Sequence, residues 1–324
     1  MNDVISKVRS GDVRTVAKLI RDIDDGIPGV WEILKELHPY TGRAYVLGVT
    51  GAPGVGKSTL VDGIISAYRA KDISVGVIAV DPTSPFTGGA ILGDRIRMQR
   101  HSTDPGVFIR SLATRGQFGG LTQSTRHVVD VFDAMGKEII IVETVGVGQD
   151  EIDIVRTAHT TLIVTIPGMG DDIQAIKAGI LEIGDVFVVN KADKDGADRA
   201  VQDIQLMLEM NRHHRQRETR WIPRIVKTEA HRGLGLDKLL EEITAHREHL
   251  FRDGREHLAV HLRNKAKIEL IDLIKQRVFA VVMEEAVESH WLDGFLDDII
   301  EKKIDPFTVC DRFLTEKNIR NLCP

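Results

Sequence analysis

The spacing of apolar residues divides the chain into three stretches of different character. In residues 1–42, apolar side chains recur at helical spacing on either side of a break at Gly26–Gly29. From Tyr45 onward, short β-branched runs alternate with helical stretches, and the predicted strands are Tyr45–Thr50, Val75–Val80, Val107–Leu112, Glu138–Val142, Leu162–Ile166, Val186–Val189 and Arg224–Val226. This alternation is typical of a mostly parallel sheet with helices on both faces.

After about Leu236 no further strand is predicted. The segment His257–Val282 carries an apolar stripe at helical spacing, formed by Leu258, Leu262, Ala266, Leu270, Leu273 and Ile274. Because such a stripe is unfavourable in water, we expect the helices after Leu236 to mediate self-association or to fold back on the sheet. The predicted organisation is a helical extension at 1–42, an α/β domain with a doubly wound sheet at 43–250 and a helical dimerisation segment at 251–324.

Composition and charge exclude several classes of protein. The 324 residues are 42% hydrophobic and 28% charged, with a formal net charge of −5, which excludes a disordered chain and a strongly basic nucleic-acid binder. No apolar run approaches the ~18 residues that a membrane span needs. The N-terminus has no signal-peptide or transit-peptide pattern, and Cys310 and Cys323 lack CxxC spacing. We therefore expect a cytoplasmic protein with reduced thiols and with no membrane or nucleic-acid partner.

The first predicted strand runs into a glycine-rich loop that continues as a helix. The loop and the start of the helix are Gly51, Ala52, Pro53, Gly54, Val55, Gly56, Lys57, Ser58 and Thr59. This is the GxxxxGKS pattern of a phosphate-binding loop in its strand-loop-helix context. Backbone N–H groups and the helix N-terminus would bind phosphate oxygens. Lys57 is expected to reach the β- and γ-phosphates, and Ser58 to ligate Mg²⁺.

An Asn-Lys-x-Asp element, formed by Asn190, Lys191 and Asp193, follows the sixth predicted strand. Such a position lies at the carboxyl edge of the sheet, where doubly wound folds bind ligands. A buried carboxylate at Asp193 would accept hydrogen bonds from N1–H and the 2-amino group of guanine, and would penalise ATP. After the last strand come Glu229, Ala230 and His231, whose backbone N–H groups we expect to face guanine O6.

The fourth predicted strand leads into an acid-x-x-Gly sequence, Glu143 to Gly146. This spacing is typical of a carboxylate that holds Mg²⁺ through water, joined to a glycine that senses the γ-phosphate. The next residue is Val147, whose apolar side chain cannot orient an attacking water. We therefore expect slow hydrolysis unless a partner or another residue, such as Gln149, completes the site.

Two further loops leave the same predicted edge of the sheet. Asp81 ends the second strand and leads into the Gly-rich stretch Thr83–Met98, which contains Asp94 and suits a nucleotide-sensing switch. The other loop, Pro167–Asp172, lies between a strand and a helix that carries Lys177. Both loops can change conformation because each contains at least two glycines.

Two longer strings are much more specific than the phosphate-loop pattern. Val80–Arg95 and Glu143–Gln149 resemble the corresponding loops of the MeaB/ArgK group of SIMIBI-class P-loop GTPases, and the similarity extends over nearly the whole chain. The resemblance implies a GTPase chaperone that docks on an adenosylcobalamin-dependent acyl-CoA mutase, such as methylmalonyl-CoA mutase. It would gate cofactor loading and protect the mutase from inactivation. It also implies a homodimer formed through the C-terminal helices, with Mg²⁺ and GTP or GDP bound and with no cobalamin bound directly.

The resemblance also assigns roles to residues at matching positions. The metal would be surrounded by Ser58, Asp81, Asp94 and Glu143, and guanine would be recognised by Asp193. The loop from Gly168 to Lys177 would couple the nucleotide state to the mutase. The catalytic set implied in this way is Lys57, Asp94, Glu143 and Lys177.

Two alternative functions stay open at this point. One is a metal-delivery GTPase chaperone, although the chain has no CxC or CPC motif and no His-rich tail. The other is a phosphotransferase acting on a transport protein. Three switch-like loops favour a protein in which the state of the phosphate is the signal.

Overall fold

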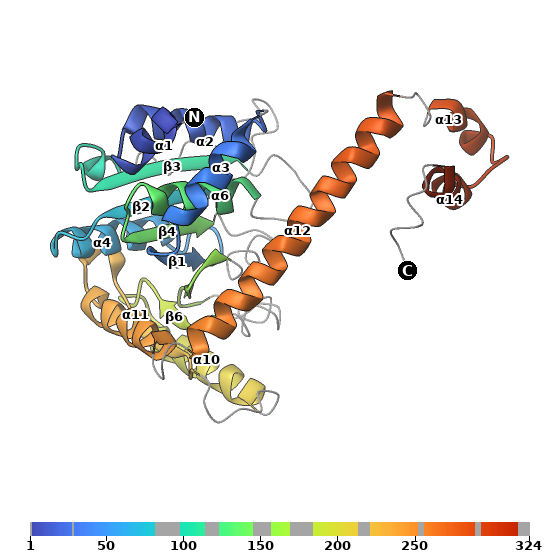
Figure 1. The fold of residues 1–324 in the computed structure, drawn as a ribbon. Coiled ribbons are helices and arrows are strands. Elements are labelled where there is room, and N and C mark those ends of the chain that lie inside the picture. The colour runs from blue at the N-terminus through green and yellow to red at the C-terminus, as the bar shows by residue number, and fades with distance from the viewer. Residues whose placement is uncertain are drawn as a thin grey trace. The chain divides into compact units, whose positions relative to one another are not determined.

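The computed structural model describes residues 2–27, 29–81, 98–113, 123–144, 157–168, 184–212, 221–251, 256–288 and 293–316. The chain forms two compact units, residues 1–259 and 260–324. The first unit contains the sheet and its covering helices, and the second contains most of α12 together with α13 and α14. Figure 1 shows the elements of both units.

A seven-stranded sheet organises the first unit. Its strands are β1 (Tyr45–Thr50), β2 (Val75–Asp81), β3 (Val107–Ala113), β4 (Ile139–Thr144), β5 (Thr160–Thr165), β6 (Val186–Val189) and β7 (Arg224–Lys227). Their spatial order is β3-β2-β4-β1-β5-β6-β7. Every neighbouring pair is parallel, so the α/β, doubly wound prediction is confirmed.

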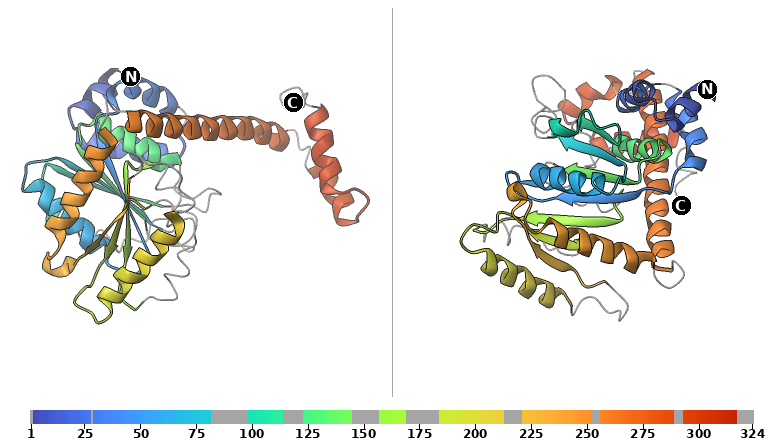
Figure 2. Two further views of the ribbon diagram at one scale, coloured as in Figure 1. Left: turned by 90° about the horizontal axis from the view of Figure 1, so that it is seen from below. Right: turned by 90° about the vertical axis from the view of Figure 1, so that its left-hand side faces the viewer.

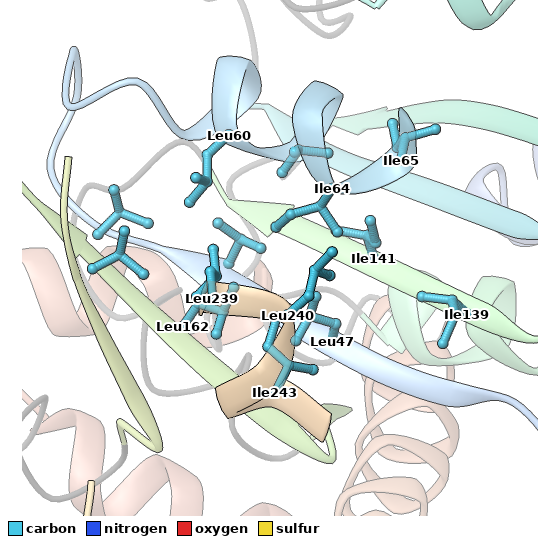
Figure 3. Close-up of a cluster of buried hydrophobic side chains, with 14 of the residues drawn as sticks. Leu47, Leu60, Ile64, Ile65, Ile139, Ile141, Leu162, Leu239, Leu240 and Ile243 are labelled. Atoms are coloured by element: carbon cyan, nitrogen blue, oxygen red, sulfur yellow. The ribbon is translucent and has the colours of Figure 1, made fainter. Parts of the chain in front are cut away.

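One face of the sheet is covered by α4 (Lys57–Arg69) and α11 (Leu236–Phe251). Alternate residues of the strands point to this face, as the two-residue period of a strand requires. Leu60 and Ile64 of α4 and Leu239 and Ile243 of α11 pack there in one buried cluster (Figure 3). The result is a buried apolar core directly beneath the helix that begins at Lys57.

The opposite face is covered by the N-terminal helices and by two helices of the α/β domain. These are α1 (Asn2–Arg9), α2 (Val13–Asp24), α3 (Val30–Leu37), α6 (Gln123–Ala134) and α10 (Ala197–Arg212). Val46, Ile78 and Ile140 point from the sheet into this side and pack with Leu19 and Phe132. The left view in Figure 2 shows α4 and α11 on one side of the sheet and α10 on the other.

Short 3₁₀ turns complete the first unit. They are η1 (His38–Tyr40), η2 (Gln99–His101) and η3 (Ala230–Arg232). Asp12 caps α2, because its carboxylate accepts a 2.8 Å hydrogen bond from the Thr15 amide. The helical extension predicted for residues 1–42 packs on the sheet, because its apolar side chains belong to the same buried cluster as those of the strands.

The C-terminal part is helical, with α12 (Glu256–Glu288), α13 (Asp293–Ile300) and α14 (Pro306–Glu316). For α11 the second of the two alternatives holds, since this helix folds back on the sheet and its apolar face is buried in the sheet core. In α12, by contrast, Leu262, Leu270 and Ile274 of the predicted stripe are exposed. Within the described ranges, no helix has the length and apolar character to cross a membrane.

Candidate functional site

The glycine-rich loop at the carboxyl end of β1 requires glycine at two positions. Gly51 has a φ of +143°, and a Cβ atom there would lie 2.1 Å from the carbonyl oxygen of Val164. Gly56 has a φ of +96°, and its Cβ would lie 2.5 Å from Nδ2 of Asn190. Both positions combine an unfavourable backbone conformation with a close neighbour. The loop therefore sits tightly against β5 and against the residue that follows β6.

Lys57 begins α4 and folds its side chain back over the loop. Its Nζ donates hydrogen bonds to the carbonyl oxygens of Gly51 at 2.7 Å and Ala52 at 3.0 Å. The side chain is almost completely buried, and it lies at a helix N-terminus, where the backbone dipoles favour negative charge. A fixed ammonium and a helix N-terminus at one loop form an anion-binding arrangement.

Ser58 and Glu143 meet between α4 and β4. The hydroxyl of Ser58 donates to Oε1 of Glu143 at 2.8 Å, and both residues are buried. Hydroxyl and carboxylate oxygens are ligands that Mg²⁺ prefers, so the two side chains fit this ion. Among the described residues, no group of three His, Cys, Asp or Glu side chains could hold a metal ion. A Mg²⁺ ion at Ser58 and Glu143 would take its other ligands from phosphate and water.

Asp81 ends β2, the strand next to β4. The backbone of Val80 pairs with Thr144, so Asp81 lies one residue beyond the end of that register and beside the carboxyl end of β4. This places the backbone of Asp81 at the edge where Glu143 lies, as the parallel sheet predicts.

Asn190 connects the glycine-rich loop to the segment after β7. Its Nδ2 donates to the carbonyl oxygen of Val55 at 2.8 Å. Its Oδ1 accepts from the amide of Ala230 and from the hydroxyl of Thr228, both at 3.1 Å. Lys191 has a φ of +54° and donates from Nζ to the carbonyl oxygen of Gly54 at 2.8 Å. Residues 190 and 191 thus hold the outer part of the loop.

Thr228 is a residue of this site that the sequence analysis missed. It is buried, its amide donates to Val189 at 2.9 Å, and its carbonyl oxygen accepts from Ala192 at 3.1 Å. Its position between β7 and Glu229 was the available signal. Through Thr228, the strand ends of β6 and β7 are held in one arrangement.

Asp193 is exposed in the structure, whereas the sequence argument for guanine selectivity assumed a buried carboxylate. The difference arises because Asp193 follows the turn at Lys191 and lies outside the sheet. Exposure keeps the carboxylate accessible to a ligand.

The segment 229–231 also differs from expectation in its hydrogen bonds. The amide of Glu229 donates to Leu234 at 3.0 Å, and the amide of Ala230 donates to Asn190. The Glu229 carboxylate accepts from Arg232 at 3.2 Å, and His231 is exposed. A contact from the first two amides to a base would therefore require their internal hydrogen bonds to open.

Several predicted residues lie outside the part of the chain that the structure describes. They are Asp94, Gly146, Val147, Gln149 and Lys177. Within the described part, the structure brings the residues 51–58, Glu143, Asn190, Lys191 and the 228–230 segment together at one edge of the sheet.

Comparisons with known proteins agree on one family. Residues 17–287 match the family described as "Methylmalonyl Co-A mutase-associated GTPase MeaB". A putative GTPase of Pyrococcus abyssi is 47% identical over 316 residues, which cover 98% of this chain and 96% of that protein. GTPase ArgK of Escherichia coli is 36% identical over 256 residues, which cover 78% of this chain and 77% of ArgK.

Two further matches are more distant. The mitochondrial methylmalonic aciduria type A homolog of Mus musculus is 31% identical over 250 residues, covering 76% of this chain and 58% of that protein. The crystal structure of LAO/AO transport system kinase has a TM-score of 0.69 at 23% identity and covers 98% of this chain and 97% of its own, which supports the fold alone. From the match over residues 17–287 and from the closely similar relatives, the chain belongs to the MeaB family of P-loop GTPases.

Proposed function

We propose that this GTPase uses the state of its bound guanine nucleotide to control an adenosylcobalamin-dependent acyl-CoA mutase. In this proposal the protein acts as a chaperone that gates cofactor loading and protects the mutase, and cobalamin binds to the mutase. The family description and the name of the mouse relative support a mutase partner.

One observation carries the nucleotide part of the proposal. The side chain of Asn190 joins the phosphate loop, through Val55, to the 228–230 segment, through Thr228 and Ala230. A nucleotide that spans these two segments would have its phosphates at Lys57 and its base near Asp193. Such a bridge explains why an Asn-Lys-x-Asp element and a phosphate loop are needed in the same site.

The residues have separate tasks in this mechanism. Lys57 would neutralise charge on the β- and γ-phosphates, and the amides of residues 54–58 would hold the phosphate oxygens. Ser58 and Glu143 would hold Mg²⁺, which withdraws charge from the phosphate oxygens when it is bound. The Asp193 carboxylate would accept the two guanine N–H groups and disfavour adenine. Asp81 and Asp94 would complete the surroundings of the metal.

The regulatory step needs a loop whose conformation depends on the γ-phosphate. We assign this role to three stretches, which are the segment that contains Gly146, residues 83–98 and the segment from Gly168 to Lys177. A nucleotide can shift the complex only through its differential affinity for two states. GTP and GDP must therefore bind unequally to the complex of this protein with the mutase.

Phosphate release by the purified protein, alone and with the adenosylcobalamin-dependent acyl-CoA mutase of the same organism, tests this proposal. We expect slow release alone, because the residue directly after Gly146 is Val147 and not Gln, and acceleration by the mutase but not by an equal amount of an unrelated protein. Lys57→Ala should abolish both rates. Fast turnover without a partner, at ~10 s⁻¹ or above, or a rate that the mutase leaves unchanged, would contradict the proposal.

Two further experiments identify the bound nucleotide and distinguish hydrolysis from phosphate transfer. Asp193→Asn should weaken GTP binding and favour xanthosine nucleotides, because its amide can donate to the 2-oxo group of xanthine. Unchanged GTP affinity by calorimetry would remove Asp193 from the base site. Free phosphate without any labelled phosphoprotein would argue against transfer to a protein, whereas a labelled phosphoprotein would support the phosphotransferase alternative.

A further inference from the structure

A cavity of about 440 Å³ lies at the amino edge of the sheet. Its wall includes Arg9 at the end of α1, Tyr40 of η1 and Arg43 before β1. The turn from α6 into β4 and Arg247 of α11 also line it. Since the residues of the nucleotide site follow the carboxyl ends of the strands, the two sites lie at opposite edges of the same sheet.

The lining of this cavity has an excess of positive charge. Arg9, Arg43 and Arg247 contribute three guanidinium groups, and Asp133 and Glu138 contribute the two carboxylates of the lining. An excess of cations around a concave surface attracts anions and concentrates them there.

Both carboxylates are already committed to the protein backbone. Asp133 accepts from the amide of Gly42 at 2.6 Å and from that of Ala44 at 3.0 Å. Glu138 accepts from the amide of Ser74 at 2.9 Å. These hydrogen bonds hold the chain before β1 and β2, so the acids have structural partners other than the arginines.

The three arginines are held without ion pairs to any described residue. The Arg9 guanidinium lies 4.0 Å from the centre of the Tyr40 ring, and that of Arg247 lies 5.0 Å from the Tyr45 ring. Stacking on a ring leaves the N–H groups at the guanidinium edge able to bind an oxyanion. Arg43 is exposed and lies in the cavity wall.

Lys137 also lines the cavity, but its ammonium is directed to Gly106, which is not part of the wall. Its Nζ donates to the carbonyl oxygen of Gly106 at 3.0 Å. Burial lowers the pKa of the ammonium, and the nearby Arg69 lowers it further.

The shape and the remaining walls narrow the class of ligand. Tyr40, Ile73 and Ile139 give the cavity an apolar part, and its volume is in the range of small-molecule sites. Guanidinium groups bind phosphate in a bidentate manner, and several cations suit a doubly charged group. We propose that this cavity binds an organic phosphate, with the phosphate at the arginines and an apolar portion against the tyrosine and isoleucines. This proposal goes beyond the nucleotide-dependent function and does not depend on it.

Calorimetric titration of the full chain with phenyl phosphate tests the proposal. The nucleotide site is first saturated with Mg²⁺ and a non-hydrolysable GTP analogue, so that the phosphate loop is filled. We expect saturable binding to the wild type. Arg43→Gln should weaken it by about tenfold, the effect of losing one charge-assisted hydrogen bond. Arg247→Gln, on a different element, should weaken it similarly.

The matched control is Arg14→Gln, which removes an exposed arginine of α2 that is not part of the cavity wall. It should bind phenyl phosphate as the wild type does. The proposal is overturned if the wild type shows no saturable binding, if Arg14→Gln loses as much affinity as Arg43→Gln, or if benzoate binds as tightly as phenyl phosphate. Affinity for the GTP analogue is measured first in every sample, so a failure of the nucleotide site is recognised separately and shows whether each variant is folded.

Discussion

Asn190 illustrates how one side chain can hold two loops of a ligand site. It uses its amide donor for Val55 and its carbonyl acceptor for Thr228 and Ala230. All of these groups are buried or nearly so, where a lost hydrogen bond leaves polar atoms without water. Asn190 is therefore important for the arrangement of the site, whichever ligand the site binds.

Asn190→Ala should lower the free energy of unfolding by about 2–3 kcal/mol, because it removes three hydrogen bonds and leaves buried partners unsatisfied. Urea unfolding followed by circular dichroism measures this. Lys194→Ala, an exposed position in the same segment, is the control and should unfold like the wild type. Equal stability of Asn190→Ala and the control would show that the loops are held by other contacts.

His127 predicts a pH dependence of stability. It is buried on α6 with its ring edge-on to Trp31, at 5.2 Å between ring centres. Burial, and to a lesser extent Arg126, lowers the pKa of His127 from 6.5 to about 4. The folded state therefore takes up this proton less readily than the unfolded state. Neutral His127 therefore contributes fully to the stability of the folded state above pH 6.5, and this contribution is lost as the pH falls toward 4.

The shift corresponds to about 3 kcal/mol between the two protonation states. His127→Gln should therefore lose less stability than the wild type when the pH is lowered through this window, in urea unfolding at a series of pH values. His38→Gln, at an exposed histidine, should follow the wild type. Parallel curves for all three proteins would exclude His127 as a source of acid sensitivity.

At the scale of elements, the sequence predicts strands well where apolar β-branched residues fill them. Tyr45–Thr50 and Val186–Val189 have the predicted bounds. β5 instead begins at Thr160, two residues before the predicted Leu162. The buried hydroxyl of Thr160 shares one hydrogen bond with the hydroxyl of Tyr45 and another, of 2.6 Å, with Nδ1 of His246. These partners are distant in sequence, so no local pattern could show that a polar residue belongs to the strand.

At the site, too, local sequence patterns predict some features, whereas contacts between residues distant in sequence determine others. The loop 51–59, Glu143 and Asn190 were expected at one edge because they follow parallel strands, and the structure places them there. The hydrogen bonds of Thr228 and the exposure of Asp193 depend on how the turns after β6 and β7 close. Such turns are set by contacts between loops, which sequence spacing does not encode.

α11 gives the prediction at this scale. Leu239 is fully buried between α4 and the sheet (Figure 3). Leu239→Ala should therefore destabilise the first unit by about 2–5 kcal/mol through lost apolar contact and the cavity that remains. Thermal or urea unfolding measures the change. Lys238→Ala, whose exposed side chain pairs with Glu241 and Glu242 on the surface, should cost far less.

If Leu239→Ala had little effect, α11 would not be an integral part of the sheet core. The helix would then be available for association, as the sequence pattern first suggested. A large loss of stability together with an unchanged oligomeric state would assign α11 to the core alone.

At the scale of the whole molecule, the first unit has two chemically different edges. The carboxyl edge carries Lys57, Ser58 and Glu143, and the amino edge carries the proposed anion cavity with Arg43 and Arg247. β4 begins beside that cavity, at Ile139, and ends beside Ser58. A sheet of parallel strands thus positions both sites through the same rigid elements while keeping them apart.

We expect the protein to self-associate through its second unit. On α12, Leu270 is 59% and Ile274 is 53% exposed, and Phe279 is 65% exposed. Burying such side chains against a second copy would contribute about 25 cal/mol per Å² of apolar area removed from water. We therefore expect a dimer, with a mass twice the chain mass of 36.0 kDa, in size-exclusion chromatography with light scattering at micromolar concentration.

The paired substitution Leu270→Ser and Ile274→Ser should shift the protein to the monomer, because it removes two neighbouring apolar side chains one helical turn apart. The control is Lys267→Ser with Lys275→Ser, which makes the same number of helix-weakening changes at exposed polar positions of α12. It should remain dimeric. A wild-type monomer, or equal dissociation of the two double variants, would mean that this stripe does not form the interface. The exposed residues of α12 would then have to be covered by another surface of the same chain or by a different protein.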